Sequence, residues 1–257
     1  MPALPASGVL LIDKPEGWSS HDVVAYLRPL LGTRKVGHAG TLDPLASGLL
    51  VVLYGHATKL SAELHRERKT YLADLALGAE TATDDREGAV TERAEVPALS
   101  DEAVRQTLAA FVGPQQQVPP AYSALHVGGQ RAYDRARRGE SMSLAPRAIV
   151  VYALDLVDRE PARLRVRVEC SAGTYVRALA RDIGRRLGTR AHLGGLRRLT
   201  VGSYSIEDAL TPAQAREFGA EGLAKRVMTE DAARRLLAGD RADIAPVSSA
   251  TITGKGK

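Results

Sequence analysis

Alternating and continuous apolar segments predict several strands along the chain. Residues 69–77, with the sequence KTYLADLAL, alternate apolar and polar positions, whereas residues 49–54 form a continuous apolar run of the length of a buried strand. Shorter strands are expected at 8–12, 149–157 and 164–170, the last two as an antiparallel pair. No apolar run approaches the ~20 residues that are needed to cross a bilayer.

Apolar residues three or four positions apart predict two helices in the first half of the chain. The first is expected to be capped by Ser20 and to end at Gly32, and the second to begin after Ser100. Their inward positions are expected to be Val23, Val24, Leu27, Leu30 and Leu31 in the first helix, and Val104, Leu108, Phe111 and Val112 in the second.

A third amphipathic helix is expected to start near Val176 and to stop at Gly188. Its apolar stripe is made of Val176, Leu179, Ala180, Ile183 and Leu187. Arginines spaced four apart lie on another face of this helix, at positions 177, 181 and 185.

The remaining segments are predicted to be mostly irregular. Residues 33–48 read as an extended loop, and 114–140 as a proline-rich loop, a short strand near 122–125 and a basic helix. After about residue 206 the chain turns helical and polar, and we expect its last ten residues to be disordered. Strands interleaved with helices, without a regular βα repeat, favour an α+β fold with a mixed or antiparallel sheet.

Composition narrows the functional classes. The 257 residues are 44% hydrophobic and 25% charged, which is typical of a soluble globular protein of one large or two modest domains. The N-terminus does not resemble a secretory signal, so a cytoplasmic location is expected. Cys170 is the single cysteine, and the six histidines are scattered, so neither a disulfide nor a metal site is predicted.

Positive charge is concentrated in one part of the chain. The net charge is +5, and between Arg163 and Arg198 there are ten arginines, no lysine and two acidic residues. Arginine can bind phosphate through two donors at once, so this distribution favours a nucleic-acid partner. A solvated helix face explains the same pattern equally well.

A glycine-flanked loop carries the candidate chemistry. The segment 37–48, GHAGTLDPLASG, places Asp43 in front of a proline, between a predicted helix and a buried strand. Catalytic side chains often occupy such loops. From spacing alone a simple Asp-Pro turn is the favoured interpretation.

Further groups of residues, together with this loop, resemble the sequence boxes of the TruB family of pseudouridine synthases over about residues 8–205. Along the chain they are Lys14-Pro15 with Ser19-Ser20; Lys69-Thr70-Tyr71 with Gly78, Thr81, Thr83, Asp84 and Gly88; Pro114, Gln115, Pro119, Pro120, Tyr122-Ser123-Ala124-Leu125, Gly129, Arg131, Tyr133, Ala136-Arg137 and Gly139; Cys170-Ser171-Ala172-Gly173-Thr174-Tyr175-Val176-Arg177; and Gly195-Leu196-Arg197-Arg198-Leu199. Each box alone is unspecific, but their common order is highly specific.

The resemblance implies a pseudouridine synthase catalytic fold at 1–206, with a central mixed or antiparallel sheet flanked by helices and loops. Residues 207–257 would then be a short helical extension with an incomplete or absent PUA domain, the RNA-binding module that bacterial members usually carry. The implied reaction is isomerisation of uridine-55 in the T-arm of tRNA, with base flipping and Asp43 as nucleophile. No metal or organic cofactor and no protein partner are expected, and a monomer is the default.

The resemblance also assigns roles to other residues. Arg177 would pair with the nucleophile and offset its desolvation, and Tyr71 would stack on the uracil. Tyr175 would lie near the base and assist proton movement, Leu196 would line the pocket, and His38 would contact the opened T-loop. The structural alternatives are a surface arginine for Arg177, a core-facing strand tyrosine for Tyr71 and a purely structural residue at the start of a helix for Tyr175. For Leu196 and His38 they are a core leucine and a structural histidine. One departure is His126, which replaces the family's usual lysine.

Three other functions are compatible with parts of this pattern. A non-catalytic RNA-binding or tRNA-folding protein would use the same basic surface. A nucleosidase would release free uracil and require a second carboxylate near Asp43. A guide-RNA-dependent rRNA pseudouridylase would normally carry its own C-terminal RNA-binding extension.

Overall fold

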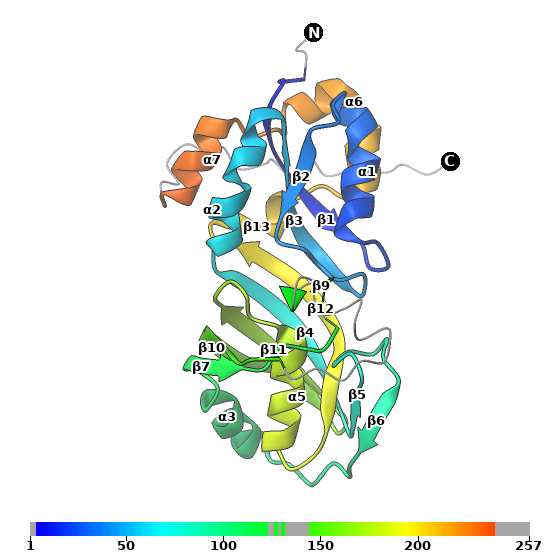
Figure 1. Cartoon of the computed structure of the whole chain (residues 1–257), viewed down its shortest axis with the longest axis vertical. Helices are drawn as coiled ribbons and strands as arrows, with labels where there is room; N and C mark the ends of the chain where they lie inside the picture. The colour runs from blue at the N-terminus through cyan, green and yellow to red at the C-terminus, as the bar shows by residue number, and fades with distance from the viewer. Residues whose placement is uncertain (1–3, 123–125, 128–129, 132–143, 240–257) are drawn as a thin grey trace, which may run out of the picture.

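The computed structural model describes residues 4–122, 126–127, 130–131 and 144–239. Its centre is a nine-stranded sheet with the order β1-β3-β12-β4-β11-β10-β7, to which β2 and β13 attach at β3 and β12 (Figure 1). The strands are β1 (Gly8–Lys14), β2 (Val36–Ala39), β3 (Ala46–Tyr54), β4 (Lys69–Leu77), β7 (Gly113–Gln117), β10 (Arg147–Glu160), β11 (Arg163–Cys170), β12 (Ala191–Val201) and β13 (Tyr204–Ser205). Because β12 pairs parallel with β3 and antiparallel with β4, the sheet is mixed, which confirms the predicted fold class.

The helices lie in two groups, one at each end of this sheet. They are α1 (Ser20–Leu31), α2 (Ser61–Arg66), α3 (Asp101–Ala109), α5 (Val176–Arg186), α6 (Pro212–Ala224) and α7 (Glu230–Leu237), with short 3₁₀ turns η1 (Gly55–Leu60) and η2 (Ile206–Asp208). In Figure 1, α1, α2, α6 and α7 surround the end formed by β1–β3, whereas α3 and α5 lie at the other end. Two-stranded sheets are formed by β5 (Ala79–Thr81) with β6 (Val90–Arg93), and by β8 (His126–Val127) with β9 (Gln130–Arg131).

The two ends have separate apolar cores. One core packs α3 and α5 against β4, β10 and β11, and includes Leu75, Val104, Val166 and Ile183. Two further clusters cover the opposite sides of β1 and β3. Every helix in the described part of the chain is too short or too polar to span a bilayer.

The long β12 is the main element that sequence patterns did not predict. Its sequence, AHLGGLRRLTV, contains paired glycines and paired arginines, which are unusual in the centre of a sheet. The strands β2 and β7 were likewise predicted to be loops and are strands. The strands β7 and β12 pair with strands that are distant in the sequence, and β2 pairs with β3. Because these pairings, not local patterns, define the three strands, the sequence alone does not reveal them.

The helix predictions were correct in position but wrong in two details. Ser19, not Ser20, caps α1, because its hydroxyl accepts from Asp22 N while the Asp22 carboxylate accepts from Ser19 N. Phe111 and Val112 both lie beyond the end of α3; Phe111 still packs against the core, whereas Val112 is 46% exposed and does not. The predicted strand at 122–125, the basic helix that follows it and the disordered tail fall largely or wholly outside the described residues, as does the side chain of His126.

Candidate active site

A pocket of about 330 Å³ lies where the loop before β3 meets β4, β12 and the start of α5. Residues 40–43 form one wall, and residues 173–177 at the start of α5 form the other. Five of the six predicted site residues line this pocket: Asp43, Tyr71, Tyr175, Arg177 and Leu196. The fold therefore brings together side chains that lie far apart in the sequence. Asp43 and Leu196, for example, are 153 positions apart (196 minus 43).

An ion pair joins the two walls of the pocket. Arg177 Nε lies 3.1 Å from Asp43 Oδ2. The Arg177 side chain is only 9% exposed whereas that of Asp43 is 44% exposed, so the arginine forms the base and the carboxylate faces the open space. The arrangement keeps one carboxylate accessible to a ligand while its counter-charge is already in place.

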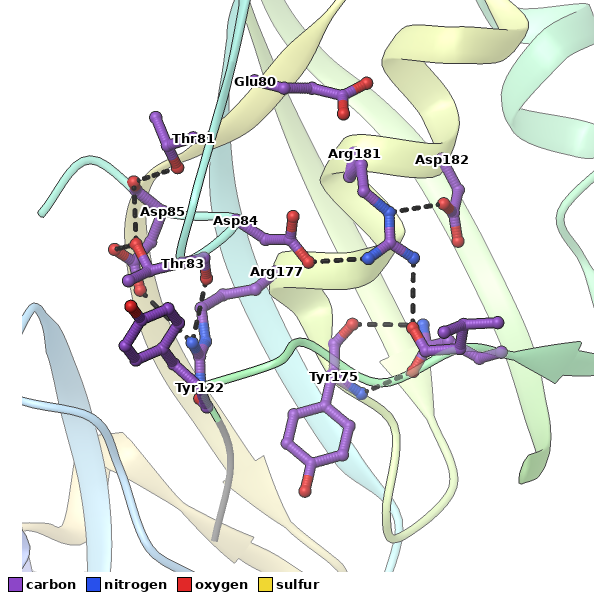
Figure 2. A network of polar contacts seen from close by, with 12 residues as sticks. Glu80, Thr81, Thr83, Asp84, Asp85, Tyr122, Tyr175, Arg177, Arg181 and Asp182 are labelled. Atoms are coloured by element: carbon purple, nitrogen blue, oxygen red, sulfur yellow. Dashed lines mark hydrogen bonds and ion pairs between the residues drawn. The ribbon is translucent and has the colours of Figure 1, made fainter. Parts of the chain in front are cut away.

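Arg177 is fixed by three further acceptors (Figure 2). Its guanidinium donates to Thr83 O at 3.0 Å and to Tyr122 O at 3.1 Å, and lies 3.5 Å from Asp85 Oδ2. The Asp85 side chain is only 6% exposed and also accepts from Thr83 Oγ1 and Glu87 N. With these acceptors on several sides, the direction of the Arg177 side chain is largely determined before any substrate binds.

Two more arginines of α5 repeat this pattern along the helix. Arg181 lies 2.7 Å from Asp84 and Arg185 lies 2.6 Å from Glu80. Asp84 and Glu80 are both buried. Burial raises the pKa of Asp84 above its ordinary value, and the nearby Arg181 acts in the opposite direction. The arginines that sequence analysis assigned to either phosphate binding or a solvated face are here paired with acidic residues of the β5–β6 region.

The Asp43 loop is held differently, through its backbone. Ser20 Oγ accepts from Leu42 N at 2.8 Å and donates to Leu42 O at 3.1 Å. The buried Lys14 ammonium donates to Pro44 O at 3.4 Å and to Trp18 O at 2.5 Å. Burial lowers the pKa of Lys14 to about 8, while the Asp43 carboxylate acts to raise it.

Arg198 holds both ends of the same loop. This arginine is 1% exposed and donates to Gly40 O at 2.9 Å and to Leu49 O at 2.6 Å. Gly48 passes so close that an added Cβ would lie 2.3 Å from the Arg198 carbonyl oxygen, and its φ of +103° also disfavours other residues. The loop therefore depends on a glycine and on a buried arginine from β12.

The apolar part of the pocket comes from β4, β12 and the α5 N-terminus. Tyr71 is partly buried against the core, and burial raises the pKa of its phenol while Arg198 opposes that change. Leu196 lies opposite Ala73 on the neighbouring strand. Tyr175 is the N-cap residue of α5, and Figure 2 shows its ring directed away from the arginine–carboxylate network. The pocket thus combines aromatic faces with one accessible carboxylate.

His38 does not line the pocket. It lies on β2, and both burial and the nearby His65 lower the pKa of its imidazole. His65 and Lys69, which sequence analysis did not select, do line the pocket. Lys69 opens the box that contains Tyr71, two positions later, which was an available signal, but nothing in the sequence distinguishes His65. Among the described residues, no group of three or more His, Cys, Asp or Glu side chains could hold a metal ion.

Comparison with known proteins agrees with this arrangement. Residues 28–176 match the family model "TruB family pseudouridylate synthase (N terminal domain)", and residues 177–237 match "tRNA pseudouridylate synthase B C-terminal domain". Two relatives, each called tRNA pseudouridine synthase B, come from Arthrobacter sp. (strain FB24) and Leifsonia xyli subsp. xyli (strain CTCB07). They are 48% and 47% identical over 217 and 255 residues, which cover 82% and 93% of this chain and 71% and 84% of theirs.

A solved structure is also similar. The "Crystal Structure of a Cbf5-Nop10-Gar1 Complex" contains a chain that matches with a TM-score of 0.70 and 28% identity, over 89% of this chain. This chain spans only 62% of the length of that one. Together, the matches and the pocket define a pseudouridylate synthase, and within that class the chain belongs to the TruB family.

The two family models divide the chain at the start of α5, between residues 176 and 177. This division crosses the central sheet, because β12 lies between β3 and β4. It also separates Asp43 from Arg177, which form the ion pair of the pocket. The pocket therefore requires residues from both matched regions.

Proposed function

We propose that this protein is a tRNA pseudouridine synthase that isomerises uridine-55 in the T-arm, with Asp43 as the nucleophile. The printed names of its relatives support tRNA as the substrate. The observation that carries the proposal is the Asp43–Arg177 ion pair, in which an accessible carboxylate is held by a buried arginine at the base of a pocket.

The reaction breaks the bond between C1′ of the ribose and N1 of uracil and forms a bond between C1′ and C5. The proton on C5 is lost and N1 gains one, so no redox partner is required. A carboxylate suits this exchange because it is nucleophilic when ionised and can leave again as the new bond forms. Attack at C1′, attack at C6 and a glycal route are all compatible with an accessible Asp43.

The pocket must also receive a base that has left the RNA stack. In this proposal, Tyr71 stacks on the flipped uracil, for which about 1–3 kcal/mol per base is typical. Leu196 packs beside the base, and Tyr175 lies near it and assists proton movement at C5. His38, which lies outside the pocket, would act on the opened T-loop rather than on the uracil.

For the organisation of the chain, we propose a catalytic domain at 1–206 and a short helical extension at 207–257. The described part of this extension is joined to β1, where Leu210 accepts from Asp13 N at 2.8 Å and donates to Leu11 O at 2.9 Å. We also propose that the protein acts in the cytoplasm as a monomer, without a protein partner.

The test is incubation of the purified protein with an unmodified tRNA transcript, followed by carbodiimide mapping of pseudouridine. We expect one new pseudouridine, at position 55 of the tRNA, and none with Asp43→Asn. Modification at another position would contradict the assigned site, and an active Asp43→Asn variant would contradict the assigned nucleophile. If the folded wild-type protein bound tRNA without any product, the non-catalytic RNA-binding function would be favoured instead.

A further inference from the structure

Gln117 forms two hydrogen bonds with the backbone of a single pocket residue. It is the last residue of β7 and is 3% exposed. Its Oε1 accepts from Tyr175 N at 2.9 Å, and its Nε2 donates to Tyr175 O at 3.1 Å. The side-chain amide thus binds both backbone polar groups of Tyr175, since one N–H of a primary amide lies on the same side as its carbonyl oxygen.

These bonds act where α5 begins. Tyr175 is the N-cap residue of α5, has an extended conformation with φ −96° and ψ 107°, and has no side-chain cap hydrogen bond. Its carbonyl oxygen also accepts from Leu179 N, in the first turn of the helix. The two bonds hold the peptide groups on both sides of the Tyr175 Cα, and the backbone orientation there sets the direction of the Tyr175 side chain and the start of the turn that carries Arg177.

Two neighbouring contacts attach the segment after Gln117 to the same part of α5. Arg181 Nη2 donates to Val118 O at 3.0 Å, and Arg177 Nη2 donates to Tyr122 O at 3.1 Å. Both of these contacts use backbone acceptors, which any residue type would provide. Gln117 is different because its own side chain makes the contact, so its effect can be tested by substitution.

We propose that Gln117 is a positioning residue for the reaction, which acts by fixing the backbone of Tyr175 and thereby the Tyr175 ring and the Arg177 guanidinium. This proposal rests on the proposed function of the pocket. It predicts that the turnover step depends on the donor and acceptor of Gln117, whereas tRNA binding does not.

Gln117→Glu provides a specific test because its hydrogen bonding changes with pH. When protonated, the carboxyl group that this substitution introduces offers one O–H donor and one carbonyl acceptor and can reproduce both bonds to Tyr175. The ionised form can only accept, and its charge would face the Tyr175 carbonyl oxygen. Burial favours the protonated form, so the transition should fall within an accessible pH range.

We would measure kcat, KM and the dissociation constant for tRNA at about pH 6 and about pH 8.5 for wild type, Gln117→Glu and Gln117→Met. Gln116→Glu and Gln116→Met, at an exposed position of the same strand, are the matched controls. At about pH 8.5 we expect kcat of both Gln117 variants to fall about tenfold to hundredfold, since small misplacements of catalytic groups reduce turnover strongly. Affinity for tRNA should change less than about twofold, a difference of under ~0.4 kcal/mol.

The pH response distinguishes positioning from general stability. Relative to wild type, Gln117→Glu should recover at least about threefold in kcat at about pH 6, whereas Gln117→Met and the Gln116 controls should not. Equal losses at both pH values, unchanged kcat, or variants that fail to fold would each overturn the proposal. An inactive wild-type protein would instead refute the proposed function. Failure of the Gln117 proposal and failure of the proposed function can therefore be distinguished.

Discussion

The wall that carries Asp43 is tied to the fold through backbone groups, whereas the wall that carries Arg177 is tied through backbone carbonyls and, in addition, through buried carboxylates. Lys14 and Arg198 donate to carbonyl oxygens of the Asp43 loop and its flanks. On the other side, Arg177 and Arg181 lie against Asp85 and Asp84. Carbonyl acceptors do not ionise, so only the second wall depends on ionised acceptors as well as on backbone geometry.

This difference suggests a division of labour between the two walls. In the proposed reaction, the Asp43 loop presents one carboxylate at a constant position, which its backbone contacts determine. In the same proposal, the α5 wall supplies the counter-charge, and paired carboxylates keep its arginines oriented. Apart from Asp43 itself, substitutions in the second wall should therefore alter turnover most, whereas those in the supports of the first wall should alter stability more than turnover.

Among the residues that hold Asp43 in place, Arg177→Met should give the largest effect. It removes the counter-charge of Asp43 and leaves the buried Asp85 unpaired. We expect kcat to fall by about 10²–10³ and the free energy of unfolding by about 3 kcal/mol. Turnover assays and urea unfolding would measure the two effects, with Arg186→Met on the same helix as control. A loss of less than about threefold in kcat would contradict the role of charge in this wall.

Asp85→Asn and Asp84→Asn should differ in their effect on kcat, although the two residues are adjacent. Asp85 contacts Arg177, the partner of Asp43, whereas Asp84 contacts Arg181. Asp84 has a φ of 60°, a conformation that Asn also tolerates, so the substitution is well matched there. We expect about a tenfold loss of kcat for Asp85→Asn and less than about threefold for Asp84→Asn. The reverse order would show that the second ion pair, not the first, controls the pocket.

Ser20→Ala tests the wall that is held through its backbone. It removes the hydroxyl that pairs with both backbone groups of Leu42, next to Asp43. We expect the free energy of unfolding to fall by about 1–3 kcal/mol because both buried groups lose a partner. The loss of kcat should be smaller than that for Asp85→Asn at the same temperature. Thermal or urea unfolding measures the first effect, and a decrease in turnover without any loss of stability would contradict this account.

The smallest effect should appear in the pH dependence of stability. Burial lowers the pKa of both His38 and His65. The unfolded chain therefore binds more protons than the folded chain near their ordinary pKa of 6.5. The contribution of these two groups to the free energy of unfolding is therefore retained above this pH and lost as the pH falls below it. His65→Gln should weaken this decline in urea unfolding between about pH 7 and pH 5, and a decline as steep as that of the wild type would contradict the account.

Local sequence patterns predicted the amphipathic helices and the alternating β4 well, because those elements carry their own signal. They did not predict β12, whose arginines and glycines are stabilised by strands on both sides and by carbonyl acceptors around Arg198. The residues of the pocket were found through resemblance, since their convergence depends on long-range pairing. His65 had no local signal at all, because its place in the pocket follows from the packing of α2 against β2.

The most direct measurement is tritium release from tRNA that carries [5-³H]uridine, because the C5 hydrogen leaves only if the new bond to C5 forms. Single-turnover release would be compared for wild type and Asp43→Asn, with binding of each to the same tRNA measured in parallel. The account predicts one tritium released per tRNA by wild type, and no release by an Asp43→Asn variant that still binds. Release by Asp43→Asn at the wild-type rate would contradict the assignment of Asp43 as the nucleophile.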